Sequence, residues 1–154
     1  MVDHAALAKA LFLKGYNCSQ AVACAFCDVM GMEIDEVARM SSSFGGGLGR
    51  LREVCGTVSG AALVLGIVKG YSDPEDYEAK KAHYALVQEF ARRFREKNGS
   101  IVCRDLLAGV EHATGGAPEP RTPDFYKMRP CPELAASAAG ILEEMLKGRS
   151  VTEG

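Results

Sequence analysis

Residues 73–97 read DPEDYEAKKAHYALVQEFARRFREK, and this stretch predicts the longest helix of the chain. Asp73 can cap its N-terminus, Pro74 suits the first helical position, and the acidic residues that follow complement the positive end of the helix dipole. Apolar side chains then recur at steps of three and four, which predicts a buried stripe of Tyr77, Ala82, Ala85, Leu86, Phe90 and Phe94. The same periodicity runs through the remaining sequence, and no segment alternates as a half-buried strand would. An all-α fold is therefore expected.

Cap and stop residues divide the rest of the chain into further helices. Predicted helices cover residues 3–14, 17–31, 35–42 and 53–69, and two more begin near Ser100 and Cys131. A stretch rich in glycine and proline, residues 114–130, is expected to be an irregular connector. We therefore predict a single-domain helical bundle of about six to seven helices over residues 1–154.

The composition limits the function classes. The chain has 154 residues, of which 47% are hydrophobic and 25% charged, as in one globular domain with a substantial core. A net charge of -2 argues against nucleic-acid binding through bulk charge. The most apolar stretch, residues 60–68, is far shorter than the roughly 20 residues that cross a bilayer. The N-terminus begins directly in a helical pattern without a signal-peptide pattern, so a reducing cytoplasm is expected.

Four of the six cysteines occur where a helix is predicted to begin: Cys18, Cys55, Cys103 and Cys131. The N–H groups and the dipole at a helix start favour an anion, and they can lower a thiol pKa from about 8.5 to roughly 3.5–7.5. Nearby Arg50, Arg52 and Arg104 would favour the thiolate, whereas Glu53 would oppose it. The four cysteines are dozens of residues apart, so a shared site would have to be assembled by the fold.

Three functions are compatible with these thiols. The first is a redox protein in which all four cysteines hold an iron–sulfur cluster or another thiophilic metal, so that each is a candidate cofactor and metal ligand. The second is a metal-free thiol/disulfide protein, in which the same cysteines are candidate catalytic residues that act on an unknown redox partner. The third is a helical interaction module whose cysteines only pack, as free cysteines often do.

The remaining candidate ligands have simpler interpretations. Cys24 and Cys27 form a C-x-x-C pair one turn apart within a predicted helix, without the strand that precedes a thioredoxin-like pair, so core packing is favoured. His4, His83 and His112 have no ligand spacing and are interpreted as core or surface residues.

Two glycine-bearing segments also carry predictions. The Gly45–Gly49 loop could bind a phosphate, but it matches neither common nucleotide-binding pattern. We interpret it as a tight connection that lets Cys55 approach its partners. The small residues of the helix at 53–69 let another backbone pack closely, which suggests a homodimer through this helix.

Several short motifs occur together in one order: NCSQAV at 17–22, FGGGLGR at 44–50, CGTVSG at 55–60, CRDL at 103–106 and CP at 131–132. In this order they resemble the bacterial and archaeal C_GCAxxG_C_C family of small redox-active proteins, named for a cysteine, a C-G-A-x-x-G motif and two further cysteines. The resemblance extends from about Leu11 to Leu146. It implies that the family cysteines are Cys18, Cys55, Cys103 and Cys131, and that Thr57 replaces the alanine of the motif.

Overall fold

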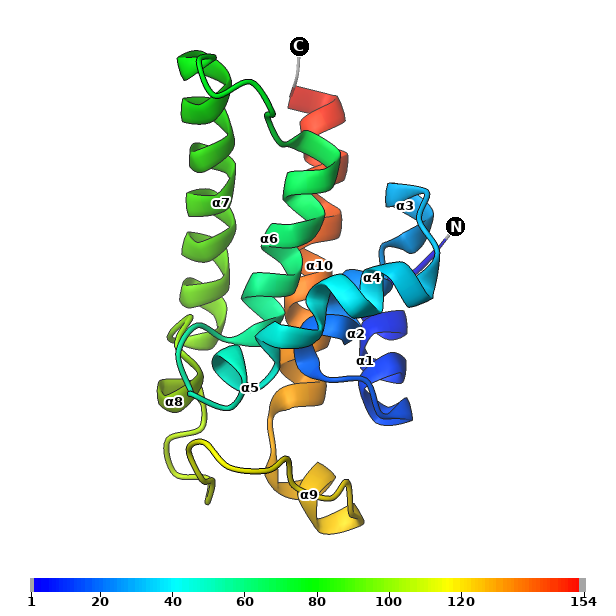
Figure 1. Cartoon of the computed structure of the whole chain (residues 1–154), viewed down its shortest axis with the longest axis vertical. Coiled ribbons are helices and arrows are strands. Elements are labelled where there is room, and N and C mark those ends of the chain that lie inside the picture. Colours follow the sequence, from blue (N-terminus) through cyan, green and yellow to red (C-terminus); the bar gives the residue numbers. More distant parts are fainter. Residues whose placement is uncertain (1, 153–154) are drawn as a thin grey trace.

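The computed structural model describes residues 2–152, and their side chains as far as residue 147. The described residues form helices and no strand, which confirms the all-α prediction (Figure 1). The elements are α1 (His4–Lys14), α2 (Cys18–Cys24), α3 (Cys27–Met30), α4 (Ile34–Ser41), the 3₁₀ turn η1 (Ser42–Phe44), α5 (Gly45–Leu48), α6 (Gly56–Lys69), α7 (Tyr77–Asn98), α8 (Cys103–Leu106), α9 (Pro123–Met128) and α10 (Cys131–Thr152).

Three long helices, α6, α7 and α10, lie side by side and set the shape of the molecule (Figure 1). α6 and α10 both begin at the end of the bundle where α5 and α8 lie, and α7 runs in the opposite direction. α1 packs against α10, and α2 packs against both α6 and α10. This arrangement gathers several helix N-termini at one end of the bundle.

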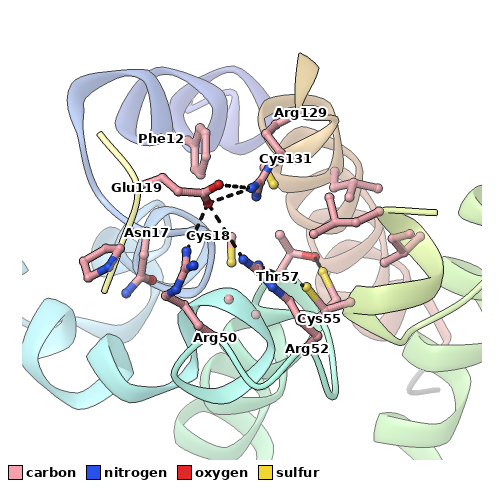
Figure 2. A pocket seen from close by; sticks show the side chains of 18 of the residues that line it. Phe12, Asn17, Cys18, Arg50, Arg52, Cys55, Thr57, Glu119, Arg129 and Cys131 are labelled. Atoms are coloured by element: carbon pink, nitrogen blue, oxygen red, sulfur yellow. Dashed lines mark hydrogen bonds and ion pairs between the residues drawn. The ribbon is translucent and has the colours of Figure 1, made fainter. Parts of the chain in front are cut away.

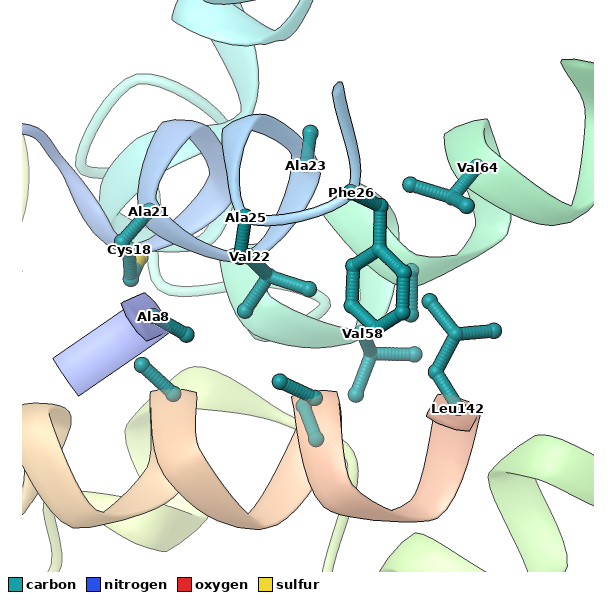
Figure 3. Close-up of a cluster of buried hydrophobic side chains, with 14 of the residues drawn as sticks. Ala8, Cys18, Ala21, Val22, Ala23, Ala25, Phe26, Val58, Val64 and Leu142 are labelled. Atoms are coloured by element: carbon teal, nitrogen blue, oxygen red, sulfur yellow. The ribbon is translucent and has the colours of Figure 1, made fainter. Parts of the chain in front are cut away.

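The core lies between α2, α6 and α10, as Figure 3 shows for Val22, Val58 and Leu142. The apolar residues of α10 at helical spacing, which the sequence predicts to form a buried stripe, are all buried: Leu134, Ala138, Ile141, Leu142 and Met145. Burial of a leucine, isoleucine or methionine side chain stabilises the fold by about 1.5–3 kcal/mol. For α1 the sequence predicts one apolar face of Ala6, Leu7, Ala10 and Leu11, of which only Leu11 is buried. The other buried residues of this helix are His4, Ala8 and Phe12.

Local capping explains where the first helices start. The Asp3 side chain accepts a hydrogen bond from the Ala6 N–H, and Gly15 ends α1, as predicted. At α2, Asn17 and Gln20 form a reciprocal capping box. The sequence therefore encodes the position of Cys18 at the start of this helix.

The helix predicted over residues 17–31 is interrupted at Ala25–Phe26, where Phe26 has non-helical backbone angles. The turn buries Phe26 completely and stacks its ring on that of His4, with 4.2 Å between the centroids. His4 in turn makes a 2.6 Å hydrogen bond with Glu143 of α10 and a 3.1 Å contact with Asp28. Tertiary burial thus overrides a locally uninterrupted helical pattern.

The longest helix begins later than predicted. Asp73 caps a short turn by accepting from the Glu75 N–H, and Asp76, whose side chain accepts from Ala79, is the N-cap of α7. The prediction that Tyr77, Ala82 and Ala85 are buried is wrong: all three are exposed, and in this half of α7 the partly buried face carries Ala79, His83 and Leu86 instead. Phe90 and Phe94 are buried as expected, and Leu86 packs on the core edge.

The segment around the last two family cysteines also differs from expectation. α8 is a single turn with Val102 as its N-cap, and the Ser100 hydroxyl instead accepts from the Val102 N–H and donates to Asp105. The predicted irregular connector contains a helix, α9, which Thr122 caps and in which Pro123 occupies the first turn.

Candidate thiol site

All four family cysteines lie at helix starts, as the sequence indicates. Cys18, Cys103 and Cys131 are the first residues of α2, α8 and α10, and Cys55 is the N-cap of α6. The structure brings all four to one pocket of about 350 Å³ (Figure 2). The four helix starts therefore meet at one site, a question that the sequence alone left open.

Cys55 and Cys103 are held side by side by a short antiparallel backbone pairing. Val54 and Val102 form an isolated β-bridge. The Cys55 N–H donates to the Ile101 carbonyl at 2.8 Å, and the Cys103 N–H donates to the Glu53 carbonyl at 2.6 Å. Two helix starts far apart in sequence are thus joined by backbone hydrogen bonds.

The glycine-rich segment forms a tight left-handed turn beside this bridge. Gly46, Gly47, Leu48, Gly49 and Arg50 all have positive φ angles. At Gly47 a Cβ would come within 2.7 Å of both the Cys103 Cβ and the Glu53 nitrogen, so only glycine fits. The interpretation as a tight connection agrees with this geometry.

The Cys18 sulfur packs on the first turn of α6. A Cβ built on Gly56 would lie 2.5 Å from the Cys18 Sγ, which means that the sulfur fills the space this glycine leaves. Backbone N–H groups of Gly46, Ser19 and Cys18 itself donate toward the sulfur and favour its thiolate. Burial nevertheless dominates and raises the Cys18 pKa.

Burial also controls the neighbouring thiols. It raises the pKa of Cys55 to about 12, with a further increase from the charge of Cys18 and an opposing hydrogen bond from Thr57. The Thr57 hydroxyl lies 3.0 Å from the Cys55 sulfur, so the residue that departs from the family motif touches a family cysteine. Burial likewise raises the pKa of Cys131 to about 12, against the opposing charges of Arg129 and Arg121.

Guanidinium groups form the other wall of the pocket. Arg50, Arg52 and Arg129 surround the carboxylate of Glu119, which comes from the connector between α8 and α9 (Figure 2). Burial opposes ionisation of Glu119, but hydrogen bonds and charge from Arg50 and Arg129 outweigh it and lower the carboxyl pKa. Arg52 also places its Nη1 3.8 Å from the Cys103 sulfur.

Sequence reasoning missed part of this wall. Glu119, Arg121 and Arg129 belong to the predicted connector and were not expected at the site. Arg121 stacks over the Phe12 ring at 4.0 Å and donates to the carbonyls of Phe12 and Tyr16, which fastens the connector to α1 and to the turn that follows it. The only feature of the sequence that could have indicated a role for residues 114–130 at the site is the unusual length of this connector.

The other candidate ligands lie elsewhere or have structural contacts. Cys24 is buried in the core and lies 3.8 Å from the Ile34 carbonyl, and Cys27 packs at the core edge. His4 belongs to the contact with α10 described above. Among the described residues, no three His, Cys, Asp or Glu side chains are arranged to hold a metal ion.

The small-residue face proposed for a homodimer is occupied within the chain. A Cβ on Gly60 of α6 would lie 2.5 Å from the Ser19 carbonyl oxygen of α2. A homodimer stays a prediction, and it would have to use other residues of α6 such as Ile67, which is 45% exposed.

The structure thus places four cysteine thiols in one pocket at the end of an all-α bundle. The model of the C_GCAxxG_C_C family, described as "putative redox-active protein", matches residues 16–145. The chain belongs to this family. No curated protein and no solved structure shows significant similarity to it. Within residues 2–152, none of the helices combines the length and apolar character needed to span a membrane.

Proposed function

We propose that this chain is a metal-free thiol/disulfide redox protein in which Cys18 and Cys55 form the reacting pair. The observation that carries the proposal is the packing of the Cys18 sulfur on Gly56, the residue that follows Cys55. Membership of the redox-active family supports it.

Cys18 is the proposed nucleophile because it is the first residue of α2, where the backbone N–H groups at the helix start favour its thiolate. Its thiolate attacks one sulfur of a small disulfide, forming a mixed disulfide and releasing the other half as a thiol that takes up the proton lost by Cys18. Cys55 then attacks the Cys18 sulfur and releases the second half as a thiol. Two electrons pass from the two cysteines to the substrate, and a dithiol reductant restores them.

Burial explains how such a pair avoids unwanted reactions. The raised pKa values of Cys18 and Cys55 keep both thiols protonated at neutral pH. Because these thiols are buried in a pocket of about 350 Å³, a substrate small enough for the pocket is favoured over a large protein. We also propose a reducing, cytoplasmic environment, because the thiols are needed in the reduced form.

The experiment treats the reduced protein, under anaerobic conditions, with one equivalent of bis(2-hydroxyethyl) disulfide and maps the products by mass spectrometry. We expect a Cys18–Cys55 disulfide in the wild type and a trapped mixed disulfide on Cys18 in Cys55→Ser. Cys18→Ser should abolish both products, whereas the control Cys24→Ser should behave as the wild type. Unchanged reaction in Cys18→Ser would overturn the proposal, provided circular dichroism shows a folded variant.

One observation favours a second candidate function, an iron–sulfur cluster held by the four family cysteines. A disulfide pair needs two thiols, yet four line the same pocket, although in this structure no three of the described side chains are arranged around a metal ion and the cysteines would have to move together to hold a cluster. Their thiolates would be the ligands, and Arg50, Arg52 and Arg129 would offset their charge; such a cluster supplies one-electron transfer. Anaerobic purification with iron and sulfide analysis tests this function, and the absence of both, also after reconstitution, would reject it.

A further inference from the structure

The pocket contains more positive charge than the chain itself neutralises. Three guanidinium groups, those of Arg50, Arg52 and Arg129, face one carboxylate. Arg52 is 3% exposed, so solvent contributes little to its charge balance. Burying a cation without a partner is costly, which makes an additional anion favourable here.

One donor in this cluster has no partner. The Arg52 Nη2 atom is buried and makes no hydrogen bond, and the nearest carboxylate oxygen, that of Glu119, is 3.8 Å away. The other groups of Arg52 are used: its Nε donates to the Ala113 carbonyl at 2.9 Å, and its Nη1 faces Cys103. These contacts hold the Arg52 side chain in place, and its Nη2 remains without a hydrogen-bond partner. Arg52 is also one of the residues that line the pocket.

Glu119 shows what kind of group suits this position. Its two oxygens accept from Arg129 Nη2 at 2.7 and 2.8 Å, and one of them also accepts from Arg50 at 3.0 Å. Its side chain is 32% exposed, more than any of the three arginines around it, and it lies on the connector rather than on a long helix. A carboxylate from outside the chain could make the same contacts and in addition reach Arg52.

We infer that Arg50, Arg52 and Arg129 form a binding site for a small carboxylate ligand, which Glu119 occupies in its absence. The site shares its pocket with the four family cysteines. Resting on the proposed function, the inference then names the substrate class: a small disulfide that carries a carboxylate. The guanidinium groups would hold the carboxylate while the disulfide faces Cys18.

The binding experiment uses succinate, which has carboxylates and no sulfur, and measures its affinity by isothermal titration calorimetry. Loss of a charged hydrogen-bond donor typically weakens binding about tenfold or more, so Arg52→Gln and Arg129→Gln should each show this loss. Glu119→Gln removes the competing carboxylate and should bind succinate more tightly than the wild type. Arg92→Gln, which removes the same charge from an exposed part of α7, is the matched control and should bind as the wild type.

The substrate experiment compares dithiodiglycolate, which carries two carboxylates, with the neutral bis(2-hydroxyethyl) disulfide. We expect dithiodiglycolate to oxidise the wild type about tenfold faster or more, and Arg52→Gln, but not Arg92→Gln, to remove this preference.

The outcomes separate the two proposals. If succinate shows no saturable binding to the wild type or to Glu119→Gln, or if Arg52→Gln and Arg92→Gln bind it equally, the carboxylate site is refuted even if Cys18 and Cys55 react. If succinate binds as expected but no Cys18–Cys55 disulfide forms, the carboxylate site is supported and the proposed thiol/disulfide function is refuted.

Discussion

The sulfur of Cys18 occupies the space above the Cα of Gly56, so that these two residues fit together only because residue 56 has no side chain. The contact joins the starts of α2 and α6, and it brings the first two family cysteines to one place. Its first consequence concerns substitution at the glycine.

Gly56→Ala should destabilise the protein by about 1–3 kcal/mol, because its Cβ would meet the Cys18 sulfur at 2.5 Å and the Phe44 carbonyl oxygen at 2.8 Å. Urea unfolding under reducing conditions measures the change. Gly66→Ala is the matched control on the same helix, since nothing lies within 4 Å of its added Cβ. It should leave stability unchanged or raise it by up to about 1 kcal/mol. Equal effects of the two substitutions would argue against the contact.

The hydroxyl of Thr57 should matter to the reactivity of Cys55. Thr57→Val keeps the volume but removes the hydrogen bond that favours the thiolate, so alkylation of Cys55 by iodoacetamide should slow by about 2- to 10-fold. Thr57→Ser retains the hydroxyl and should alkylate at nearly the wild-type rate. Cys131 in the same sample serves as the internal reference by mass spectrometry. A Cys55 rate that is identical in Thr57→Val and wild type would show that the hydrogen bond has no effect.

Stability should fall at alkaline pH because of the buried thiols. The pKa values of Cys55 and Cys131 are raised from 9.0 to about 12. The unfolded chain therefore loses protons above pH 9 that the folded chain retains, and the free energy of unfolding declines as pH rises from 9 towards 12. Between pH 9 and 10 we expect a loss of about 1 kcal/mol for each thiol.

The measurement compares urea unfolding of the wild type with that of Cys55→Ser/Cys131→Ser at both pH values, with reductant present. The double variant lacks these titrating groups, so its decline should be smaller by the contribution of both thiols. Parallel declines would mean that neither thiol has a raised pKa in the folded state.

Glu143 should stabilise the closure of α1 on α10. The side chain and the backbone N–H of His4 hold the pKa of this carboxyl below its usual value. Glu143→Gln should lower the free energy of unfolding at pH 7 by about 1–3 kcal/mol. The difference from the wild type should shrink as pH falls below about 4.5, because the wild-type carboxyl then becomes protonated. Glu144→Gln, an exposed neighbour, should have little effect at either pH.

Local sequence patterns predicted where the helices at the site begin, but they did not predict that these helix starts come together in one pocket. Asn17 with Gln20, and Pro132 after Cys131, act within a few residues of the cysteines they position. Convergence depends instead on the bridge between Val54 and Val102 and on the backbone fit at Gly47, which involve residues about fifty positions apart. No local pattern encodes such pairings.

Two errors have the same physical origin. The helix over residues 17–31 contains no glycine or proline at Phe26, and its interruption follows from complete burial of that ring against His4. The arginine wall was missed because Arg129 and Glu119 reach the pocket through a connector whose path is set by tertiary contacts such as Arg121 on Phe12.

The contact between His4 and Glu143 joins residues near the two ends of the chain. During synthesis Cys18 and Cys55 leave the ribosome well before Arg129 and Cys131, since the chain emerges from its N-terminus. The pocket is therefore incomplete until its last helix has docked on the first. The site therefore exists only once folding is complete, and an unfinished chain has its early thiols without Glu119 and Arg129.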